Sequence, residues 1–198
     1  MLIKGNLIKV PGKREKHMNK QNSTVMKLAE TALLAALCYV SFTFLQIKIP
    51  VPGGDATSLH IGNTFCVLGA LLLGGWYGGL AGSIGMTIAD LMDPVYITGA
   101  PKTFVLKLCI GLITGLVAHK LAKINETNDK KYVFKWSLIA SIAGLAFNVV
   151  ADPVVGYFYK QYILGQPQEV ASILAKLSAG ATFVNAIVST ILVVILYN

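Results

Sequence analysis

The sequence predicts an all-α integral membrane protein, a compact bundle of six transmembrane helices with a cytoplasmic N-terminus. Three observations support this fold class. Hydrophobic residues make up 55% of the 198 and charged residues only 13%, about half of the roughly 25% expected in soluble domains. Apolar runs long enough to cross a bilayer recur along the chain. Most of the 17 basic residues form two clusters beside apolar runs, as cytoplasmic segments do.

The chain divides into two units. Residues 1–26 form a basic tail, which we expect to be disordered and cytoplasmic because its first 20 residues are largely polar and basic and the apolar run that follows has no convincing signal-peptide cleavage site. Residues 27–198 form the membrane domain. Its first span ends before Pro50-Val51-Pro52-Gly53-Gly54, which cannot continue a helix. Single spans are predicted at about residues 28–47, 103–118, 133–155 and 171–197.

Residues 61–92 are mostly apolar, and we interpret them as two further spans joined by a tight turn. A single helix of this length would measure roughly 48 Å at ~1.5 Å per residue, well beyond a hydrocarbon core of about 30 Å. Glycines between residues 74 and 82 favour a turn and close helix packing. Six spans place the basic loop 120–135 on the same side as the tail. The connections 48–60, 93–102 and 160–170 then face outward.

Composition and spacing exclude several classes of function. The three cysteines lie in apolar stretches, at spacings that fit no zinc or haem motif, so we expect them to act as small hydrophobes. The three histidines fall in the tail, an outer loop and the inner end of a span, too dispersed to share a metal. We expect no metal and no cofactor. The basic clusters favour lipid headgroups over nucleic acid, because no soluble surface displays them.

Polar residues within the predicted spans gather at the outer end of the bundle. Such residues need a partner or a water-filled cavity and therefore mark candidate sites. Each also has a structural explanation: Lys107 could snorkel outward, and Asn185 could join two helices. Together they suit a pocket for a small aromatic ligand with polar substituents. The candidate substrate-binding residues are His60, Asn63, Asp90, Asp93, Tyr96, Thr103, Lys107, Asn148, Asp152, Tyr157 and Asn185.

A related pattern occurs twice among these candidates, as Asp93-Pro94 and Asp152-Pro153. Proline disfavours the helical conformation in the residue before it. We therefore expect both aspartates to stand where an apolar helix stops.

The first span carries a stripe of small residues that includes Ala29, Ala32 and Ala36. Small residues four apart allow another helix to pack closely. The stripe therefore predicts either a contact inside the bundle or a docking surface for a separate membrane subunit.

From about Lys27 to Tyr197 the chain resembles the substrate-specific S components of energy-coupling factor (ECF) transporters. The resemblance rests on several short stretches in a fixed order along the chain. They are Ala32-x-x-x-Ala36, Leu59-His60-Ile61-Gly62-Asn63, Leu73-Gly74-Gly75-Trp76-Tyr77-Gly78-Gly79-Leu80-Ala81-Gly82, Ala100-Pro101-Lys102-Thr103-Phe104-Val105-Leu106-Lys107, Gly156-Tyr157-Phe158 and Asn185.

This resemblance implies a multi-pass protein of a prokaryotic plasma membrane that captures a vitamin or its precursor at the extracellular side. It implies no catalytic residue and no enzyme activity. Uptake would depend on a transmembrane coupling subunit, which meets the alanine-rich first helix, and on two cytoplasmic ATP-binding subunits. The sequence agrees in one respect, because it contains no G-x-x-x-x-G-K-[ST] phosphate loop.

Within that family, His60-x-Gly62-Asn63 and Thr103-x-x-x-Lys107 look most like the riboflavin, hydroxymethylpyrimidine or pyridoxine branch. The thiamin branch is usually rich in binding-site tryptophans, whereas only Trp76 and Trp136 occur here. The acids and amides favour pyridoxine or hydroxymethylpyrimidine, with riboflavin next. The alternatives are a self-sufficient small-solute transporter and a membrane-embedded enzyme. Polar residues on one side only disfavour the transporter, and the lack of G-x-S-x-G and H-E-x-x-H disfavours the enzyme.

Overall fold

The computed structural model describes residues 13–51 and 55–197, with side chains from Asn22 onward. Over that part the chain forms six α-helices and one antiparallel pair of strands. In chain order the elements are α1 (Lys13–Phe44), β1 (Gln46–Val51), β2 (Asp55–His60), α2 (Gly62–Leu73), α3 (Gly75–Met92), α4 (Ala100–Gly115), α5 (Lys130–Phe158) and α6 (Gln168–Tyr197). Short π-helical turns continue α4 over Leu116–Leu121 and α5 over Tyr159–Ile163.

Four helical segments of the described chain are long and apolar enough to cross a membrane. They are Asn22–Phe44, Ile97–Glu126, Lys130–Ile163 and Gln168–Tyr197. Helix α2 is apolar but has 12 residues, about 18 Å at ~1.5 Å per residue, which is shorter than a hydrocarbon core of about 30 Å. The chain is therefore a mostly helical, multi-pass membrane protein.

The predicted turn within residues 61–92 is confirmed. Helices α2 and α3 are separated by Gly74 alone. Its backbone φ of +101° is one that residues with a Cβ rarely adopt. The two helices then pack in direct backbone contact. A Cβ added at Gly78 would lie 2.0 Å from the backbone nitrogen of Ala70, so only glycine allows this approach.

The outer connection 48–60, expected to be a loop in an all-α protein, is instead a β-hairpin. Strands β1 and β2 pair in register from Gln46 opposite His60 to Val51 opposite Asp55. The β-branched residues in this stretch favour strands, and pairing satisfies backbone groups that a loop would leave open. Pro50 is compatible with the pairing because it lies on an edge strand of a two-stranded sheet.

The start of the first helix also differs from the prediction. Helix α1 begins at Lys13, so residues 13–26, expected to be disordered, are helical. The segment after Pro11-Gly12 is rich in Lys, Glu, Met and Gln, which have high helix propensity. Residues 1–12 of the predicted tail lie outside the described residues.

The two Asp-Pro pairs behave differently from each other. Helix α3 ends as predicted: Asp93 follows its last residue in an extended conformation, with φ −111° and ψ 115°, as Pro94 favours. The prediction for Asp152 is wrong, because α5 continues through Pro153 as far as Phe158. Packing of α5 against α4 and α6 outweighs the hydrogen bond that this proline cannot make.

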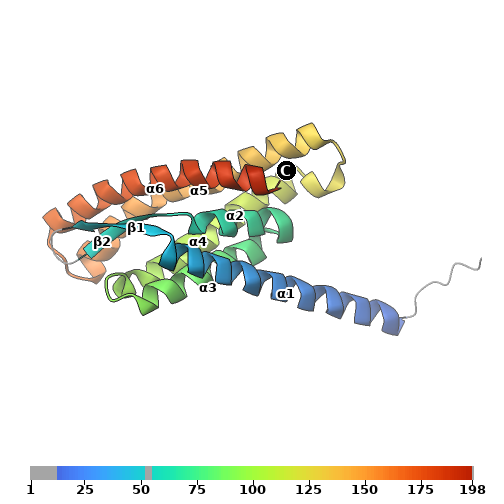
Figure 1. Ribbon diagram of the computed structural model, residues 1–198, viewed down its shortest axis with the longest axis horizontal. Helices are drawn as coiled ribbons and strands as arrows, with labels where there is room; N and C mark the ends of the chain where they lie inside the picture. The colour runs from blue at the N-terminus through green and yellow to red at the C-terminus, as the bar shows by residue number, and fades with distance from the viewer. Residues whose placement is uncertain (1–12, 52–54, 198) are drawn as a thin grey trace, which may run out of the picture.

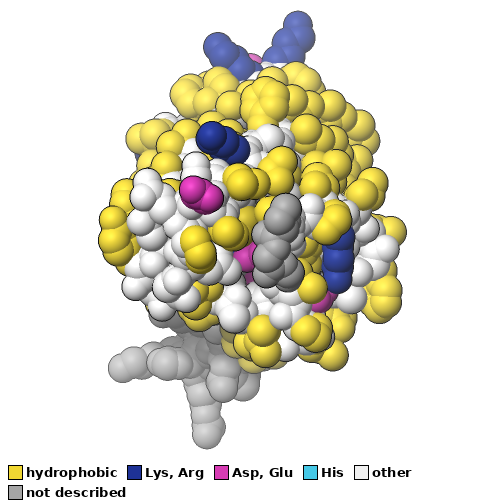
Figure 2. All heavy atoms as spheres, turned by 90° about the vertical axis from the view of Figure 1, so that its left-hand side faces the viewer, with side chains coloured by type: hydrophobic (Ala, Val, Ile, Leu, Met, Phe, Trp, Pro, Cys, Tyr) yellow, Lys and Arg dark blue, Asp and Glu magenta, His cyan; other side chains and the backbone are white. Residues whose placement is uncertain are grey.

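The bundle has two different ends (Figure 1). The β-hairpin, the α3–α4 connection and the α5–α6 connection lie together at one end, whereas the start of α1 and the basic segment between α4 and α5 lie toward the other. Figure 2 looks onto the hairpin end, where polar side chains, backbone atoms and acidic groups occupy much of the surface and apolar side chains surround them. Between the ends the helices enclose an apolar core that includes Cys38, Val67, Met86, Ile110, Leu145 and Val193.

Candidate functional site

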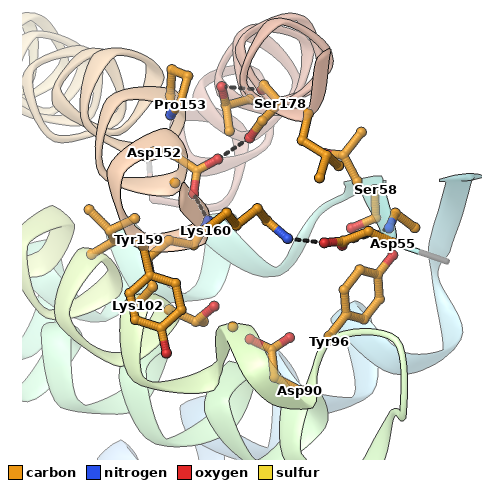
Figure 3. A pocket seen from close by; sticks show the side chains of 18 of the residues that line it. Asp55, Ser58, Asp90, Tyr96, Lys102, Asp152, Pro153, Tyr159, Lys160 and Ser178 are labelled. Atoms are coloured by element: carbon orange, nitrogen blue, oxygen red, sulfur yellow. Dashed lines mark hydrogen bonds and ion pairs between the residues drawn. The ribbon is translucent and has the colours of Figure 1, made fainter. Parts of the chain in front are cut away.

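A cavity of about 120 Å³ opens near the hairpin end, between β2 and helices α3, α4, α5 and α6 (Figure 3). Its walls combine charged, hydroxyl and amide side chains with a few apolar ones. The polar lining consists of Asp55, Thr57, Ser58, His60, Asp90, Tyr96, Thr98, Lys102, Thr103, Lys107, Asp152, Tyr159, Lys160, Ser178, Thr182 and Asn185. The apolar lining includes Phe42, Val95, Leu106, Leu164 and Leu174.

Most of the predicted site residues meet in this cavity. They come from β2 and from all four helices around it, so the fold gathers residues that are widely separated in the sequence. The predicted residues in the lining are His60, Asp90, Tyr96, Thr103, Lys107, Asp152 and Asn185.

The remaining four predicted residues lie outside the lining. Asn63 and Asn148 are each 1% exposed within the bundle, and their side-chain oxygens have no hydrogen-bond partner among the described residues. Tyr157 lines a separate apolar groove between α5 and α6. Asp93 lies outside the cavity, where it forms an ion pair with Lys48 of β1.

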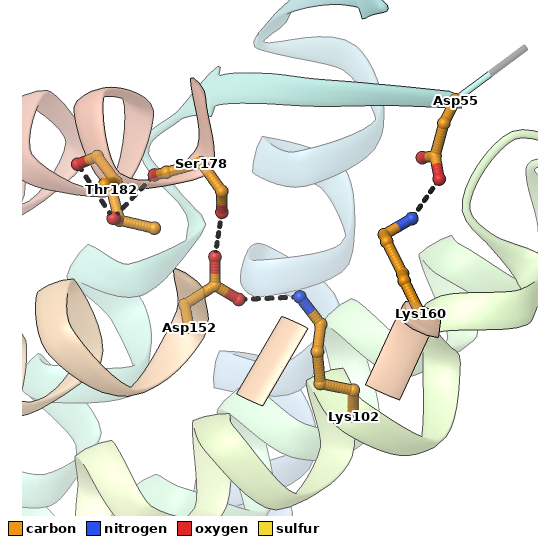
Figure 4. Close-up of polar contacts among 7 residues, drawn as sticks. Asp55, Lys102, Asp152, Lys160, Ser178 and Thr182 are labelled. Carbon is orange, nitrogen blue, oxygen red and sulfur yellow. Dashed lines mark hydrogen bonds and ion pairs between the residues drawn. The ribbon is translucent and has the colours of Figure 1, made fainter. Parts of the chain in front are cut away.

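Asp152 holds three helices together at one wall of the cavity (Figure 4). Lys102 of α4 donates a hydrogen bond from Nζ to Oδ1 of Asp152, at 2.8 Å. The hydroxyl of Ser178 on α6 donates to Oδ2 of the same carboxylate. Both oxygens are therefore occupied, and the Asp152 side chain is fixed in one position.

A second ion pair joins the β-hairpin to the end of α5. Lys160, in the π-helical turn that follows α5, donates to Oδ2 of Asp55 at the start of β2. The other carboxylate oxygen of Asp55 accepts the backbone N–H of Ala56 at 2.8 Å. Beside this pair, the Tyr159 hydroxyl donates to the carbonyl oxygen of Thr98 at 2.9 Å, which ties the same turn to the α3–α4 connection.

Asn185 of α6 attaches strand β2 to the bundle. Its Oδ1 accepts the backbone N–H of His60, and its Nδ2 donates to the carbonyl oxygen of Ser58, both at 3.0 Å. An amide suits this position because it offers one acceptor and one donor to a strand edge. Asn185 therefore positions the hairpin as well as lining the cavity.

His60 is a neutral residue at the inner end of the hairpin. Burial, together with the nearby positive charge of Lys107, lowers the pKa of His60 from 6.5 to about 3. The Nδ1 atom of His60 accepts the backbone N–H of Gly62 at 3.2 Å, and the ring packs edge-on against Phe42 with ring centroids 4.7 Å apart. The imidazole therefore contributes hydrogen bonding and apolar area to the wall, and no charge.

The outer ion pair between Lys48 and Asp93 fixes the other strand of the hairpin. Desolvation raises the pKa of Asp93, but hydrogen bonds from Lys48 and from the backbone N–H of Val95 outweigh it, so the pKa lies below its usual value. The carboxylate is thus charged at neutral pH. Nearby, burial raises the pKa of Tyr96 to about 12, which keeps its hydroxyl protonated.

Sequence reasoning missed several residues of the cavity. Asp55 and Lys160 lie in connections that were expected outside the bundle, and they meet across 105 positions of sequence. No local pattern marks such a pair. Lys102 could have been found, since it stands next to Thr103 at the outer start of a predicted span. Ser178 lies 26 residues from Asp152, and only the packing of α5 against α6 connects them.

The charges in the cavity wall balance. Three lysines and three aspartates line it, namely Lys102, Lys107, Lys160, Asp55, Asp90 and Asp152. With His60 neutral, their formal sum is zero. A cavity of this kind is suited to a ligand that is polar but carries no net charge.

A bundle of apolar helices with a polar cavity near one end defines a membrane protein that binds a small polar molecule. The family model for the S component of the ECF-type riboflavin transporter matches residues 22–198. The chain belongs to this family, and the predicted membership among ECF S components is confirmed. It is therefore a vitamin-binding subunit of a transporter, in a family of transport proteins and not of enzymes.

A solved structure of ThiT from Listeria monocytogenes is similar to the chain. The two share 19% sequence identity with a TM-score of 0.63, over 88% of this chain and 94% of that one. At this identity the similarity concerns the fold. No curated protein matches the chain.

Proposed function

We propose that the chain captures an uncharged, single-ring heterocyclic vitamin or precursor, with pyridoxine or hydroxymethylpyrimidine as the leading candidates. The observation that supports this most is the small, charge-balanced cavity with three lysines and three aspartates in its wall. Pyridoxine and hydroxymethylpyrimidine each combine a flat ring with hydroxyl or amino donors and ring-nitrogen acceptors. Such groups complement carboxylates and ammonium groups at short range.

The balance of positive and negative charges in the cavity wall argues against a phosphorylated form of the vitamin. A phosphate brings a charge near −2 at neutral pH, and binding it would require free cations. Two of the cavity lysines, Lys102 and Lys160, are already paired with aspartates. A phosphorylated ligand would therefore have to break these pairs or remain uncompensated in a buried site.

Riboflavin is the second candidate, favoured by the description of the matching family. It is also uncharged, but it carries three fused rings and a sugar-alcohol chain. A cavity of about 120 Å³, with the paired Lys160 and Asp55 in its wall, suits one ring better than three.

The same proposal includes the arrangement in the membrane. The N-terminus and the basic segment 120–135 face the cytoplasm of a prokaryote, the cavity faces outward, and all six helices cross or enter the bilayer of the plasma membrane. The short α2 would be accommodated by local thinning of the bilayer. Uptake then depends on a transmembrane coupling subunit and two cytoplasmic ATP-binding subunits.

A ligand screen on the purified protein in detergent tests the proposal. Pyridoxine, hydroxymethylpyrimidine, riboflavin and pyridoxal phosphate are compared by thermal shift, without ATP. A ligand at about 100 times its Kd stabilises the folded state by roughly 2.7 kcal/mol. We expect this effect for one of the two single-ring compounds and none for pyridoxal phosphate. Thr98→Trp, which places a large ring at the exposed rim of the cavity, should diminish the shift.

The outcomes separate the candidates. A shift with riboflavin alone would replace the leading ligand with the second. The absence of a shift with all the unphosphorylated compounds would contradict capture of these vitamins. A shift that Thr98→Trp leaves unchanged would place the binding site elsewhere.

A further inference from the structure

The six charged residues of the cavity fall into two groups. Lys102 pairs with Asp152, and Lys160 pairs with Asp55. The remaining two, Asp90 of α3 and Lys107 of α4, take part in none of the ion pairs formed within 4.0 Å among the described residues. The cavity therefore contains two closed pairs and two open charges.

The aspartates differ in how many hydrogen bonds they already accept. Asp152 accepts from Lys102 and Ser178, one bond to each oxygen. Asp55 likewise accepts at both oxygens, from Lys160 and from the backbone N–H of Ala56. Asp90 differs from both, because no ion pair within 4.0 Å involves it among the described residues, and its carboxylate lies near the side-chain hydroxyl of Thr103. A carboxylate has about four acceptor positions, so Asp90 retains most of its capacity.

Burial makes these two open charges costly. Asp90 is 3% exposed and Lys107 is 7% exposed, so neither is substantially compensated by bulk water. An isolated buried charge is among the most unfavourable groups in a protein, and such groups are normally paired. Both side chains line the cavity, and Figure 3 shows the Asp90 carboxylate directed into it. The missing partners of these two charges would therefore be groups that occupy the cavity.

We propose that Asp90 and Lys107 are the specificity-determining residues of the site, and that the ligand bridges them. A hydroxyl or amino group of the ligand donates to Asp90, and a ring nitrogen or ring oxygen substituent accepts from the ammonium of Lys107. The two closed pairs, in contrast, are positioning elements that shape the wall. This inference rests on the proposed function and identifies which groups of the ligand are recognised.

The geometry of α4 supports a single recognition surface. Thr103 and Lys107 are four residues apart, so they lie on one face of the helix, and both line the cavity. Thr103 also contacts Asp90 across the α3–α4 interface. Asp90, Thr103 and Lys107 therefore form one continuous part of the cavity wall.

Matched substitutions distinguish an open charge from a paired one. Lys107→Met and Lys102→Met each replace an ammonium with an apolar side chain of similar length. Removing the open charge should leave the melting temperature of the ligand-free protein unchanged or raised, because no ion pair within 4.0 Å is broken among the described residues. Removing the paired charge should lower it, since Asp152 then remains buried without its cation. Asp90→Asn tests the carboxylate with little change in shape.

Binding of pyridoxine and hydroxymethylpyrimidine to each variant is measured by calorimetry in detergent. For the compound that the unmodified protein binds more tightly, Lys107→Met and Asp90→Asn should each weaken binding about tenfold or more, as for loss of a charged hydrogen bond. Analogues of that compound, each lacking one hydroxyl or amino group, identify the contact. The analogue that lacks the group donating to Asp90 should bind the unmodified protein and the Asp90→Asn variant equally.

The results separate this inference from the proposed function. If the unmodified protein binds neither compound, the proposed function fails first. If it binds one and both variants keep its affinity within about threefold, the specificity role is wrong while the function stands. The role is also wrong if Lys107→Met destabilises the ligand-free protein as much as Lys102→Met, or if every analogue loses as much affinity on Asp90→Asn as the parent compound.

Discussion

His60 is a titratable side chain held in its uncharged form by the fold. It belongs to β2, accepts a hydrogen bond from Gly62 at Nδ1 and packs against Phe42. A proton at Nδ1 would remove this hydrogen bond and place a second positive charge near Lys107. His60, whose backbone N–H binds Asn185 of α6, is thus intolerant of protonation.

This intolerance predicts a pH dependence of stability. The pKa of His60 is about 3 in the folded protein and 6.5 in the unfolded reference, so below pH 6.5 the unfolded chain binds a proton that the folded chain does not. The resulting stabilisation is complete above pH 6.5 and declines as the pH falls toward 3. At pH 5 the loss is roughly 2 kcal/mol.

Melting temperatures between pH 7.5 and 4.5 measure the effect. Because carboxylates also titrate in this range, the comparison is made with His60→Gln, which cannot take up the proton. We expect the decline to be shallower in the variant than in the unmodified protein. Parallel curves would show that His60 does not cause it.

At the scale of elements, the α2–α3 hairpin depends on backbone contact at Gly78. A methyl group at this position would meet the backbone of Ala70 and Gly69 on α2, and backbone cannot move aside as a flexible side chain can. Gly78→Ala should therefore destabilise the protein by about 1–3 kcal/mol, the range for overpacked cores.

Gly180 provides a matched control, since it also lies within a helix but nothing is near the position of its Cβ. Gly180→Ala should be neutral, or stabilising by about 0.5–1 kcal/mol. Thermal unfolding of both variants in the same detergent gives the comparison. Equal effects of the two substitutions would show that close packing at Gly78 is not limiting.

Elements of different kinds were predictable to different extents. The turn at Gly74 and the end of α3 at Asp93 were predicted correctly, because both depend on local backbone chemistry. The β-hairpin was missed, since its strands are short and its stability depends on attachment to α6 through Asn185. Continuation of α5 past Pro153 was missed for a related reason, because packing outweighs a local preference.

The candidate site was only partly predictable, because the sequence shows which residues are polar but not where their side chains point. Rare polar residues inside apolar spans, such as Asp90 and Lys107, are visible in the sequence, and they line the cavity. Asn63 and Asn148 satisfy the same criterion yet lie outside the lining. The direction in which a polar side chain points depends on helix rotation, which spacing alone does not determine.

At the scale of the whole molecule, one face of α1 is left exposed by the described residues of the bundle. Ala29, Ala32 and Ala36 are exposed, whereas Leu34 and Ala35 on another face are buried against α2 and α3. These three alanines therefore form an outward-facing surface and do not pack against another helix among the described residues. We propose that this surface meets the coupling subunit, because small residues permit close approach of another helix.

Ala32→Trp should therefore abolish ATP-driven uptake in vesicles containing the partner subunits, while ligand affinity stays within about twofold, as for surface substitutions. Ile187→Trp, at an exposed position of α6, is the control and should leave uptake intact. Equal loss of uptake in both variants, or loss of binding in Ala32→Trp, would contradict a docking role for this face.

The contribution of α6 to the cavity has a consequence for biosynthesis. Ser178 and Asn185 reach the cavity from α6, which follows the elements of every other cavity wall in the sequence, so they leave the ribosome after those walls have been made. Until they arrive, Asp152 lacks its hydroxyl donor and strand β2 lacks its hydrogen bonds to Asn185. A chain interrupted before α6 would carry these polar groups unsatisfied in or beside the lipid, at a cost that finished chains do not bear. Ligand capture is therefore a property that the nascent protein gains only once α6 has entered the membrane.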